Sequence, residues 1–280
     1  MRHATVELIR RALEEDGAEA DITTLSTVPA AALAQASIIV REAAVIVGIV
    51  VAAETFRTLD PQVVVELLVE DGAVVQPGQL VARVSGPARS LLSAERVALN
   101  FLGHFSGIAT LTAQCVRAIE GTRARILDTR KTTPGLRALE KEAVRLGGGQ
   151  NHRFGLNDGV LIKDNHIKAA TSIMQAVSAA RRLAPHLLKI EVECETLAQV
   201  QEALEADADV ILLDNMAVDL MRSAVELVRR TAPKVLIEAS GNIGTNPTRL
   251  AAVAATGVDF ISLGALTHSA PNVDVSLEFA

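Results

Sequence analysis

The sequence predicts an α/β protein whose larger part is built on a parallel β-sheet. Three observations predict this fold class. Of the 280 residues, 49% are apolar but only 2% are aromatic, so the core consists of Ala, Val, Leu and Ile, which are typical of buried parallel strands. From about residue 123, short apolar segments alternate with amphipathic ones, as in βα units. Polar residues follow the apolar segments, and this favours a (β/α) barrel, because barrel active sites form at the C-terminal strand ends.

The composition also excludes several classes of protein. The net charge is −6 and the chain has no Trp or Tyr, which argues against a nucleic-acid binder. The longest apolar run, 43–53, is shorter than the roughly 20 residues that a membrane-spanning helix needs. The first residues lack the apolar stretch of a signal peptide, and the two cysteines, Cys115 and Cys194, suit a core better than a disulfide framework. We therefore expect a cytoplasmic protein.

The first hundred residues predict a helix at 6–15 followed by short strands. The predicted strands are 36–41, 44–47 and 63–69. Next, the turns at Asp71-Gly72 and Pro77-Gly78 predict a hairpin with the rhythm of lipoyl- and biotinyl-carrier domains. Those carriers present a lysine after the second strand, whereas 85–89 contains none. We therefore expect the hairpin to be structural.

The rest of the chain predicts one long helix and then six βα units. The helix is expected over 91–118, broken or kinked near Gly103 and Gly107. The predicted strands are 125–128, 159–163, 189–193, 210–214, 235–239 and 260–263. The predicted helices between them are 135–146, 169–183, 197–205, 220–231 and 247–256.

Basic residues are concentrated between residues 123 and 168. Ten Lys or Arg residues and five acids lie there, in a chain whose total charge is negative. This pattern predicts a cleft that attracts a small polyanion. The best candidates flank strand ends and glycine-rich turns, namely Arg130, Lys131, Arg153 and Lys163. A second set, Arg137, Lys141 and Arg145, shares one helix face and is expected to be solvated.

The later strands end in acids and glycines. Glu193 and Asp214 end consecutive strands, a placement that suits Mg²⁺ held by few protein oxygens together with water and substrate phosphate. Glycine turns at 240–244 and 263–265 follow the last two strands, where barrels commonly bind a phosphate group. No covalent nucleophile stands out, so these groups favour transfer chemistry driven by positioning and charge.

The segment from Asp128 to Ile167, DTRKTTPGLRALEKEAVRLGGGQNHRFGLNDGVLIKDNHI, resembles the quinolinate phosphoribosyltransferase family. Further matches are SAERVALNFLGHFSGIATLT, EVECETL, ADVILLDNM, IEASGNI and ISLGALTHSAP. The resemblance implies that quinolinate and phosphoribosyl pyrophosphate give nicotinate mononucleotide, pyrophosphate and CO₂ with Mg²⁺, in NAD biosynthesis. It also implies an N-terminal α/β sandwich domain (1–115), an incomplete α/β barrel carrying the active site (116–266) and a homodimer or hexamer. Residues 267–280 are expected to pack back onto the first domain.

The resemblance assigns roles residue by residue. It implies quinolinate binding by Arg130, His152, Arg153, Lys163 and, from the neighbouring subunit, Arg96. It implies phosphoribosyl pyrophosphate binding by Lys131, Glu193, Asp214, Ser240, Gly241, Asn242, Gly264, Ala265 and His268. Catalysis is expected from Lys131, Lys163, Glu193 and Asp214, and Mg²⁺ ligation, directly or through water, from Glu193 and Asp214.

Some alternatives stay open. His152 is alternatively a structural histidine in a glycine turn, and His166 is expected to orient the loop after Lys163. Asn242 stands where many relatives have glycine, which puts the geometry of the phosphate loop in doubt. The rival functions are a related protein associated with molybdenum transport, and a catalytically silent phosphate-binding module on the same scaffold.

Overall fold

The computed structural model describes residues 3–280 and divides the chain into two compact units. The first unit comprises residues up to 113 together with 133–148 and 270–280, and the second comprises 114–132 and 149–269. Residues 1 and 2 lie outside the described part, and the expected helix 6–15 lies within α1 (His3–Asp16). Among the described helices, none is both long enough and apolar enough to span a membrane.

The second unit is a six-stranded parallel sheet with the strand order β6-β11-β10-β9-β8-β7. The strands are β6 (Arg125–Leu127), β7 (Val160–Ile162), β8 (Ile190–Cys194), β9 (Val210–Asp214), β10 (Leu236–Ser240) and β11 (Phe260–Ser262). All six predicted strands are present, and the predicted α/β class with an incomplete barrel is confirmed. The sheet ends at β6 and β7, which are its two edge strands.

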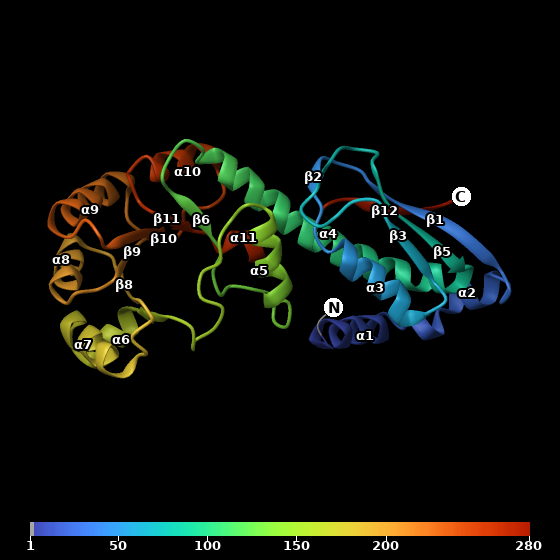
Figure 1. Ribbon diagram of the computed structural model, residues 1–280, viewed down its shortest axis with the longest axis horizontal. Coiled ribbons are helices and arrows are strands. Elements are labelled where there is room, and N and C mark those ends of the chain that lie inside the picture. The colour runs from blue at the N-terminus through green and yellow to red at the C-terminus, as the bar shows by residue number, and fades with distance from the viewer. Residues whose placement is uncertain (1–2) are drawn as a thin grey trace. The chain divides into compact units, whose positions relative to one another are not determined.

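Helices cover the outer side of this sheet (Figure 1). They are α6 (Asp164–Ala170), α7 (Ile173–Leu183), α8 (Leu197–Glu205), α9 (Val218–Thr231) and α10 (Pro247–Ala254), whereas the short α11 (Ala265–His268) follows the end of β11 and does not belong to this outer layer. Local sequence explains where several begin. The side chain of Asn246 accepts a hydrogen bond from the backbone N–H of Arg249, and Pro247 occupies the first turn of α10. The predicted helix 169–183 is two helices, because Ser172 caps the start of α7.

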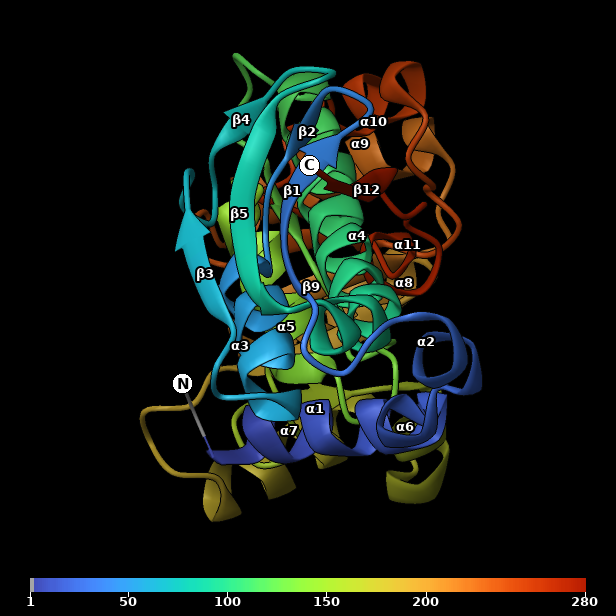
Figure 2. The same cartoon turned by 90° about the vertical axis from the view of Figure 1, so that its right-hand side faces the viewer.

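The first unit contains an antiparallel sheet in the order β12-β1-β5-β3. Its strands are β1 (Leu33–Val40), β3 (Val64–Leu67), β5 (Leu80–Pro87) and the C-terminal β12 (Val275–Phe279), and β2 (Ala44–Val45) pairs separately with β4 (Val74–Val75). Figure 2 shows β1 and β5 running side by side. The helices are α1 (His3–Asp16), the 3-10 turn η1 (Ala18–Ala20), α2 (Ile22–Thr27), α3 (Ile49–Leu59), α4 (Ala88–Ala118) and α5 (Arg137–Leu146).

The expected break in the long helix is absent, because α4 continues through Gly103 and Gly107. These glycines instead allow a backbone segment to approach the helix. A Cβ atom at Gly103 would lie 2.8 Å from the carbonyl oxygen of Val273, and one at Gly107 would overlap the carbonyl oxygen of Pro271. The backbone N–H of Val273 donates to the carbonyl of Gly103 at 3.0 Å. The glycines therefore reflect close packing of the C-terminal segment.

Helix α5 belongs to the first unit, whereas the predicted domain boundaries place its residues in the barrel. Its C-terminal Gly147 packs so closely against α4 that a Cβ atom there would lie 2.8 Å from Cβ of Thr112. Glu140 is fully buried and lies 3.0 Å from Nε2 of His104 on α4. Lys141 is only 2% exposed, so the expectation that this helix face is simply solvated was wrong for that residue.

Candidate active site

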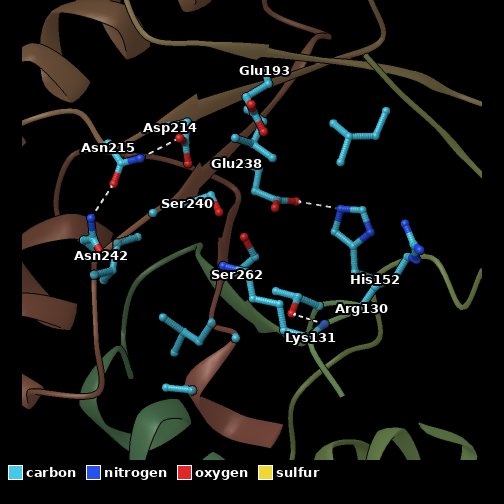
Figure 3. A pocket seen from close by; sticks show the side chains of 18 of the residues that line it. Arg130, Lys131, His152, Glu193, Asp214, Asn215, Glu238, Ser240, Asn242 and Ser262 are labelled. Carbon is cyan, nitrogen blue, oxygen red and sulfur yellow. Dashed lines mark hydrogen bonds and ion pairs between the residues drawn. The ribbon is translucent and has the colours of Figure 1, made fainter. Parts of the chain in front are cut away.

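A pocket opens at the C-terminal ends of the parallel strands and has a volume of about 770 Å³, which is within the usual range for small-molecule sites. Its labelled side chains converge from several strands and loops (Figure 3). The lining residues are Thr129, Arg130, Lys131, His152, Arg153, Leu161, Lys163, Glu193, Leu212, Asp214, Asn215, Glu238, Ser240, Gly241, Asn242, Ile243, Gly244, Ser262, Leu263, Gly264, Ala265 and His268. Cations, acids and glycine turns therefore share one concave surface.

The loop after β6 brings two of the cations, Arg130 and Lys131, to the pocket. The hydroxyl of Thr129 accepts a hydrogen bond from the backbone N–H of Lys131 at 3.0 Å. The buried Thr267 hydroxyl donates to the carbonyl of Lys131 at 2.7 Å. The side chain of Lys131 packs over Gly264, where a Cβ atom would lie 2.9 Å from its Cδ. These contacts fix Lys131 beside the last glycine turn.

His152 and Arg153 lie in the loop before β7, and both ring nitrogens of His152 have partners within the protein. Its Nε2 lies 3.2 Å from Oε2 of Glu191, and its Nδ1 accepts the backbone N–H of Arg153 at 2.7 Å. Burial lowers the pKa of His152, but the carboxylates of Glu191 and Glu238 outweigh it, so the net shift is upward. Protonation of Nδ1 would break the bond from Arg153, so the two influences oppose each other. His152 therefore holds the backbone of Arg153 and also lines the pocket.

The guanidinium of Arg153 donates to the carbonyl of Gly159 at 2.9 Å. Burial and the neighbouring charge of Arg130 lower the pKa of Arg153. The charge of Arg130 thus acts on Arg153, and a dianion between the two guanidinium groups would relieve their mutual repulsion.

Lys163 lies directly after β7 and forms an ion pair with Glu193 at the end of β8. The side chain of Glu193 is 11% exposed and that of Lys163 is 45% exposed. The backbone N–H of Lys163 donates to Nδ1 of His166 at 3.0 Å. His166 thus orients the start of α6, in agreement with the structural role predicted for it.

Asp214, at the end of β9, lies against the glycine turn that follows β10. The side-chain amide of Asn215 donates to Oδ2 of Asp214 at 2.6 Å, and the amide of Asn242 donates to Oδ1 of Asn215 at 2.9 Å. Gly241 has φ +80° and sits between them, so a Cβ atom there would lie 2.5 Å from Oδ1 of Asn215. The glycine turn at Gly241 therefore packs closely against the side chains of Asp214 and Asn215.

A pair of buried acids, Glu191 and Glu238, lies beside His152. Among the described residues, these three form a group of potential metal ligands whose atoms lie within 4.8 Å of one another. Burial, followed by the charge of Glu191, raises the pKa of Glu238 to about 8. Burial beside a second acid therefore favours the protonated form of Glu238.

The raised pKa of Glu238 predicts a pH-dependent stability. The unfolded state ionises from about pH 4.5, whereas the folded state holds the proton up to about pH 8. The contribution of Glu238 to the free energy of unfolding is therefore fully present below the pKa of the unfolded state. It is lost as the pH rises to 8, by at most about 1.4 kcal/mol per pH unit. Glu238→Gln should show a shallower loss of unfolding free energy than the unsubstituted protein in urea titrations between pH 5 and 8. Parallel curves would contradict this, and the exposed Glu226→Gln is the control.

Thirteen of the fourteen predicted site residues line this one pocket. They are Arg130, Lys131, His152, Arg153, Lys163, Glu193, Asp214, Ser240, Gly241, Asn242, Gly264, Ala265 and His268. The fourteenth, Arg96, lies on α4 in the first unit and does not line it. None of the lining residues is Phe, and Phe154, close in sequence to Arg153, is half exposed and outside the lining.

The sequence analysis missed several lining residues, above all Glu238, Asn215 and Ser262. A signal for Glu238 was present in the strand alternation. It stands two residues before Ser240, and side chains two apart in a strand point to the same face of the sheet. Glu191 and Glu193 share this spacing on β8.

Comparison with known proteins shows the family to which the chain belongs. The model of the "Quinolinate phosphoribosyl transferase, C-terminal domain" matches residues 108–278, and that of the N-terminal domain matches residues 21–106. The chain belongs to the quinolinate phosphoribosyltransferase family. It is therefore an enzyme, a phosphoribosyltransferase, and the recognition made from the sequence is confirmed.

Individual members of the quinolinate phosphoribosyltransferase family are similar over most of their length. The chain is 48% identical to a probable nicotinate-nucleotide pyrophosphorylase [carboxylating] of Synechocystis, covering 87% of this chain and 82% of the relative. It is 47% identical to the nicotinate-nucleotide pyrophosphorylase [carboxylating] of Mycobacterium leprae, covering 98% and 97%. The solved nicotinate-nucleotide pyrophosphorylase of Francisella tularensis is 39% identical, with a TM-score of 0.92 over 99% of this chain and 96% of that one.

Proposed function

We propose that this member of the family carries out its reaction in the pocket at the strand ends. Quinolinate and phosphoribosyl pyrophosphate give nicotinate mononucleotide, pyrophosphate and CO₂, a step of NAD biosynthesis. The observation that carries the proposal is the division of the pocket into two ends. Arg130 and His152 lie at one end, whereas Asp214 and the glycine turn with Asn242 lie at the other (Figure 3). A planar dicarboxylate suits the first end and a pentose phosphate suits the second.

The dicarboxylate end consists of Arg130, Arg153 and Lys163. Bidentate contacts from guanidinium groups match carboxylates in geometry as well as in charge. No aromatic side chain other than the imidazoles of His152 and His268 lines the pocket. We therefore propose that the pyridine ring is held through its carboxylates, and that His152 acts mainly by holding Arg153 in place.

The phosphoribosyl end consists of the turn after β10, the turn after β11 and Lys131. Backbone N–H groups in glycine turns suit a 5′-phosphate, and the α11 helix begins directly after Gly264. Lys131 lies against that turn and suits the pyrophosphate. Ser240, Gly241, Asn242, Ala265 and His268 complete this end.

We propose that Mg²⁺ binds at Glu193 and Asp214, directly or through water. Their carboxylates end the neighbouring strands β8 and β9, and both line the pocket. Mg²⁺ is typically held by one or two protein carboxylates, and water and substrate phosphate complete its coordination. The ion would neutralise charge on the pyrophosphate. The buried group of His152, Glu191 and Glu238 is not needed for this role.

The chemistry then follows from position and charge. The ring nitrogen of quinolinate attacks C1 of the ribose, and the C1–oxygen bond breaks with its electron pair going to pyrophosphate. Carboxylates of Glu193 and Asp214 stabilise the positive charge that develops on the ribose. The new pyridinium nitrogen draws electrons, so the bond from C2 to its carboxylate breaks, CO₂ leaves and C2 takes up a proton. Lys131 and Lys163 hold the charged groups in line.

We further propose a cytoplasmic homodimer in which Arg96 of the partner subunit completes the dicarboxylate end, with hexamers as the alternative assembly. Mixing Arg96→Ala subunits with Lys163→Ala subunits tests this. Each variant alone should be nearly inactive, and after subunit exchange about a quarter of the sites should be intact, because each mixed twofold dimer has one unaltered site. Full exchange without recovered activity would contradict the proposal. Cell fractionation tests the location.

One assay tests the function as a whole. The protein is incubated with quinolinate, phosphoribosyl pyrophosphate and Mg²⁺, and nicotinate mononucleotide is measured by chromatography. Product should form and should depend on all three components. Nicotinate in place of quinolinate should give little product, because the second carboxylate is then missing. Absence of product at high enzyme concentration would overturn the proposal and would favour a silent phosphate-binding module.

A further inference from the structure

We infer that Asn242 is a positioning residue for phosphoribosyl pyrophosphate, acting through Asn215 on the carboxylate of Asp214. The inference rests on the proposed function and deepens it, because it identifies what joins the phosphate turn to the acid that faces the pentose. We name the pair Asn215 and Asn242 the asparagine clasp.

The clasp consists of two side-chain hydrogen bonds in series (Figure 3). The amide of Asn242 donates to Asn215 at 2.9 Å, and the amide of Asn215 donates to Asp214 at 2.6 Å. The backbone N–H of Asn215 also donates to the carbonyl of Ser240 at 3.1 Å. One side chain thus links the end of β9 to the turn that follows β10.

Both residues of the clasp have strained backbones. Asn215 has φ +53° and Asn242 has φ +44°. Such left-handed conformations are uncommon for residues other than glycine and concentrate at functional sites, where the surroundings hold them in place. Only two other described non-glycine residues have positive φ, Thr171 and Asp207, and neither lines the pocket. The structure therefore accepts strain in order to bring these two amides together.

Close packing makes the clasp a rigid link. Gly241 lies between the partners, and a Cβ atom there would lie 2.5 Å from Asn215 and 2.6 Å from Asp214. The turn at Gly241 therefore packs directly against Asp214. The hydrogen bond from Asn242 to Asn215, and that from Asn215 to Asp214, hold the turn and the carboxylate at this separation. That distance matters to a pentose phosphate, whose phosphate and hydroxyls are a fixed length apart. This distance matters little for quinolinate, because the protein cations proposed to bind quinolinate lie on other loops.

Asn242→Gly provides the first test, because glycine adopts φ +44° without strain and removes only the side chain. The KM for phosphoribosyl pyrophosphate should rise about 2- to 12-fold, since one hydrogen bond of ordinary strength is lost. The KM for quinolinate should change less than about 2-fold, and the melting temperature by no more than about 2 °C. Titration calorimetry with phosphoribosyl pyrophosphate alone and with quinolinate alone should show the same selectivity.

A double-mutant cycle separates action through Asn215 from direct phosphate binding by Asn242. Asn215→Gly should also weaken phosphoribosyl pyrophosphate binding. In that background, adding Asn242→Gly should cause no further loss, because its partner is already missing. A full additional loss would show that Asn242 contacts the substrate itself and would overturn the inference.

Asp207→Gly is the matched control. Asp207 is exposed, has φ +61° and lies outside the pocket lining, so this variant makes the same backbone change away from the site. It should leave both KM values unchanged. If Asn242→Gly instead lowers the melting temperature and raises both KM values together, the clasp is merely structural and the inference fails. An unsubstituted protein that makes no product would refute the proposed function, whereas an active protein indifferent to Asn242→Gly would refute only this inference.

Discussion

Lys163→Ala should lower kcat/KM for quinolinate by about 100- to 1000-fold while leaving the fold intact. The ammonium group of Lys163 lies in the pocket and forms an ion pair with Glu193. Its removal deletes the proposed charge-assisted contact to the substrate and also leaves the mostly buried carboxylate of Glu193 without this partner. Losses of about 3–4 kcal/mol are usual when one member of such a pair is truncated, and each 1.36 kcal/mol corresponds to a factor of ten. Steady-state kinetics with varied quinolinate measures the effect.

Lys168→Ala is the control for that experiment. Lys168 lies five residues further along the chain, pairs with Asp164 at 2.9 Å and has a side chain that is 72% exposed. It does not line the pocket, so its loss should change kcat/KM by less than about 2-fold, as for most exposed ion pairs. Near-normal kinetics in Lys163→Ala, with unaltered melting of both variants, would remove Lys163 from the site.

Gly241→Ala should lower kcat/KM for phosphoribosyl pyrophosphate by about 100-fold or more. A methyl group there would lie 2.6 Å from Oδ1 of Asp214, and the backbone φ of +80° is unfavourable for alanine. The turn or the acid must then move by several tenths of an ångström, and misplacement on the scale of 1 Å costs about 100-fold in rate. Kinetics with varied phosphoribosyl pyrophosphate, together with calorimetric binding, measures the loss.

Gly121→Ala separates the methyl contact from the backbone strain. Gly121 has a nearly identical φ of +82°, but a Cβ atom there would meet nothing within 4 Å, and the residue does not line the pocket. Both variants should lose about 1 kcal/mol of stability from the strain, and only Gly241→Ala should lose activity. Equal losses of activity would mean that strain, not the approach to Asp214, explains the effect.

Most of the candidate site could be predicted because it follows from strand periodicity. Parallel strands bring their C-terminal ends to one edge, so Lys163, Glu193 and Asp214 had to lie near one another once the strands were recognised. Glu238 was assigned no role although its spacing from Ser240 places it on the pocket face, because its burial and its contact with Glu191 are visible only in the tertiary structure. The sequence assigned no role to Asn215, because that role depends on a hydrogen bond with Asn242, which lies 27 residues away in the chain.

Periodicity and motif together determined the fold class, the six parallel strands and the positions of the cations and acids, because these depend on local patterns. The tertiary structure alone decided the features that rest on partners distant in sequence. Helix α3 is one, since its apolar run shows no clear period and its N-terminus is capped from Asp71, which accepts the backbone N–H groups of Gly48 and Ile49 at 2.7 and 2.9 Å. The unbroken course of α4 is another, because only the returning backbone at Val273 explains why a glycine stands at 103. Local sequence cannot encode a contact whose partner lies elsewhere in the chain, and such contacts set the final geometry of this molecule.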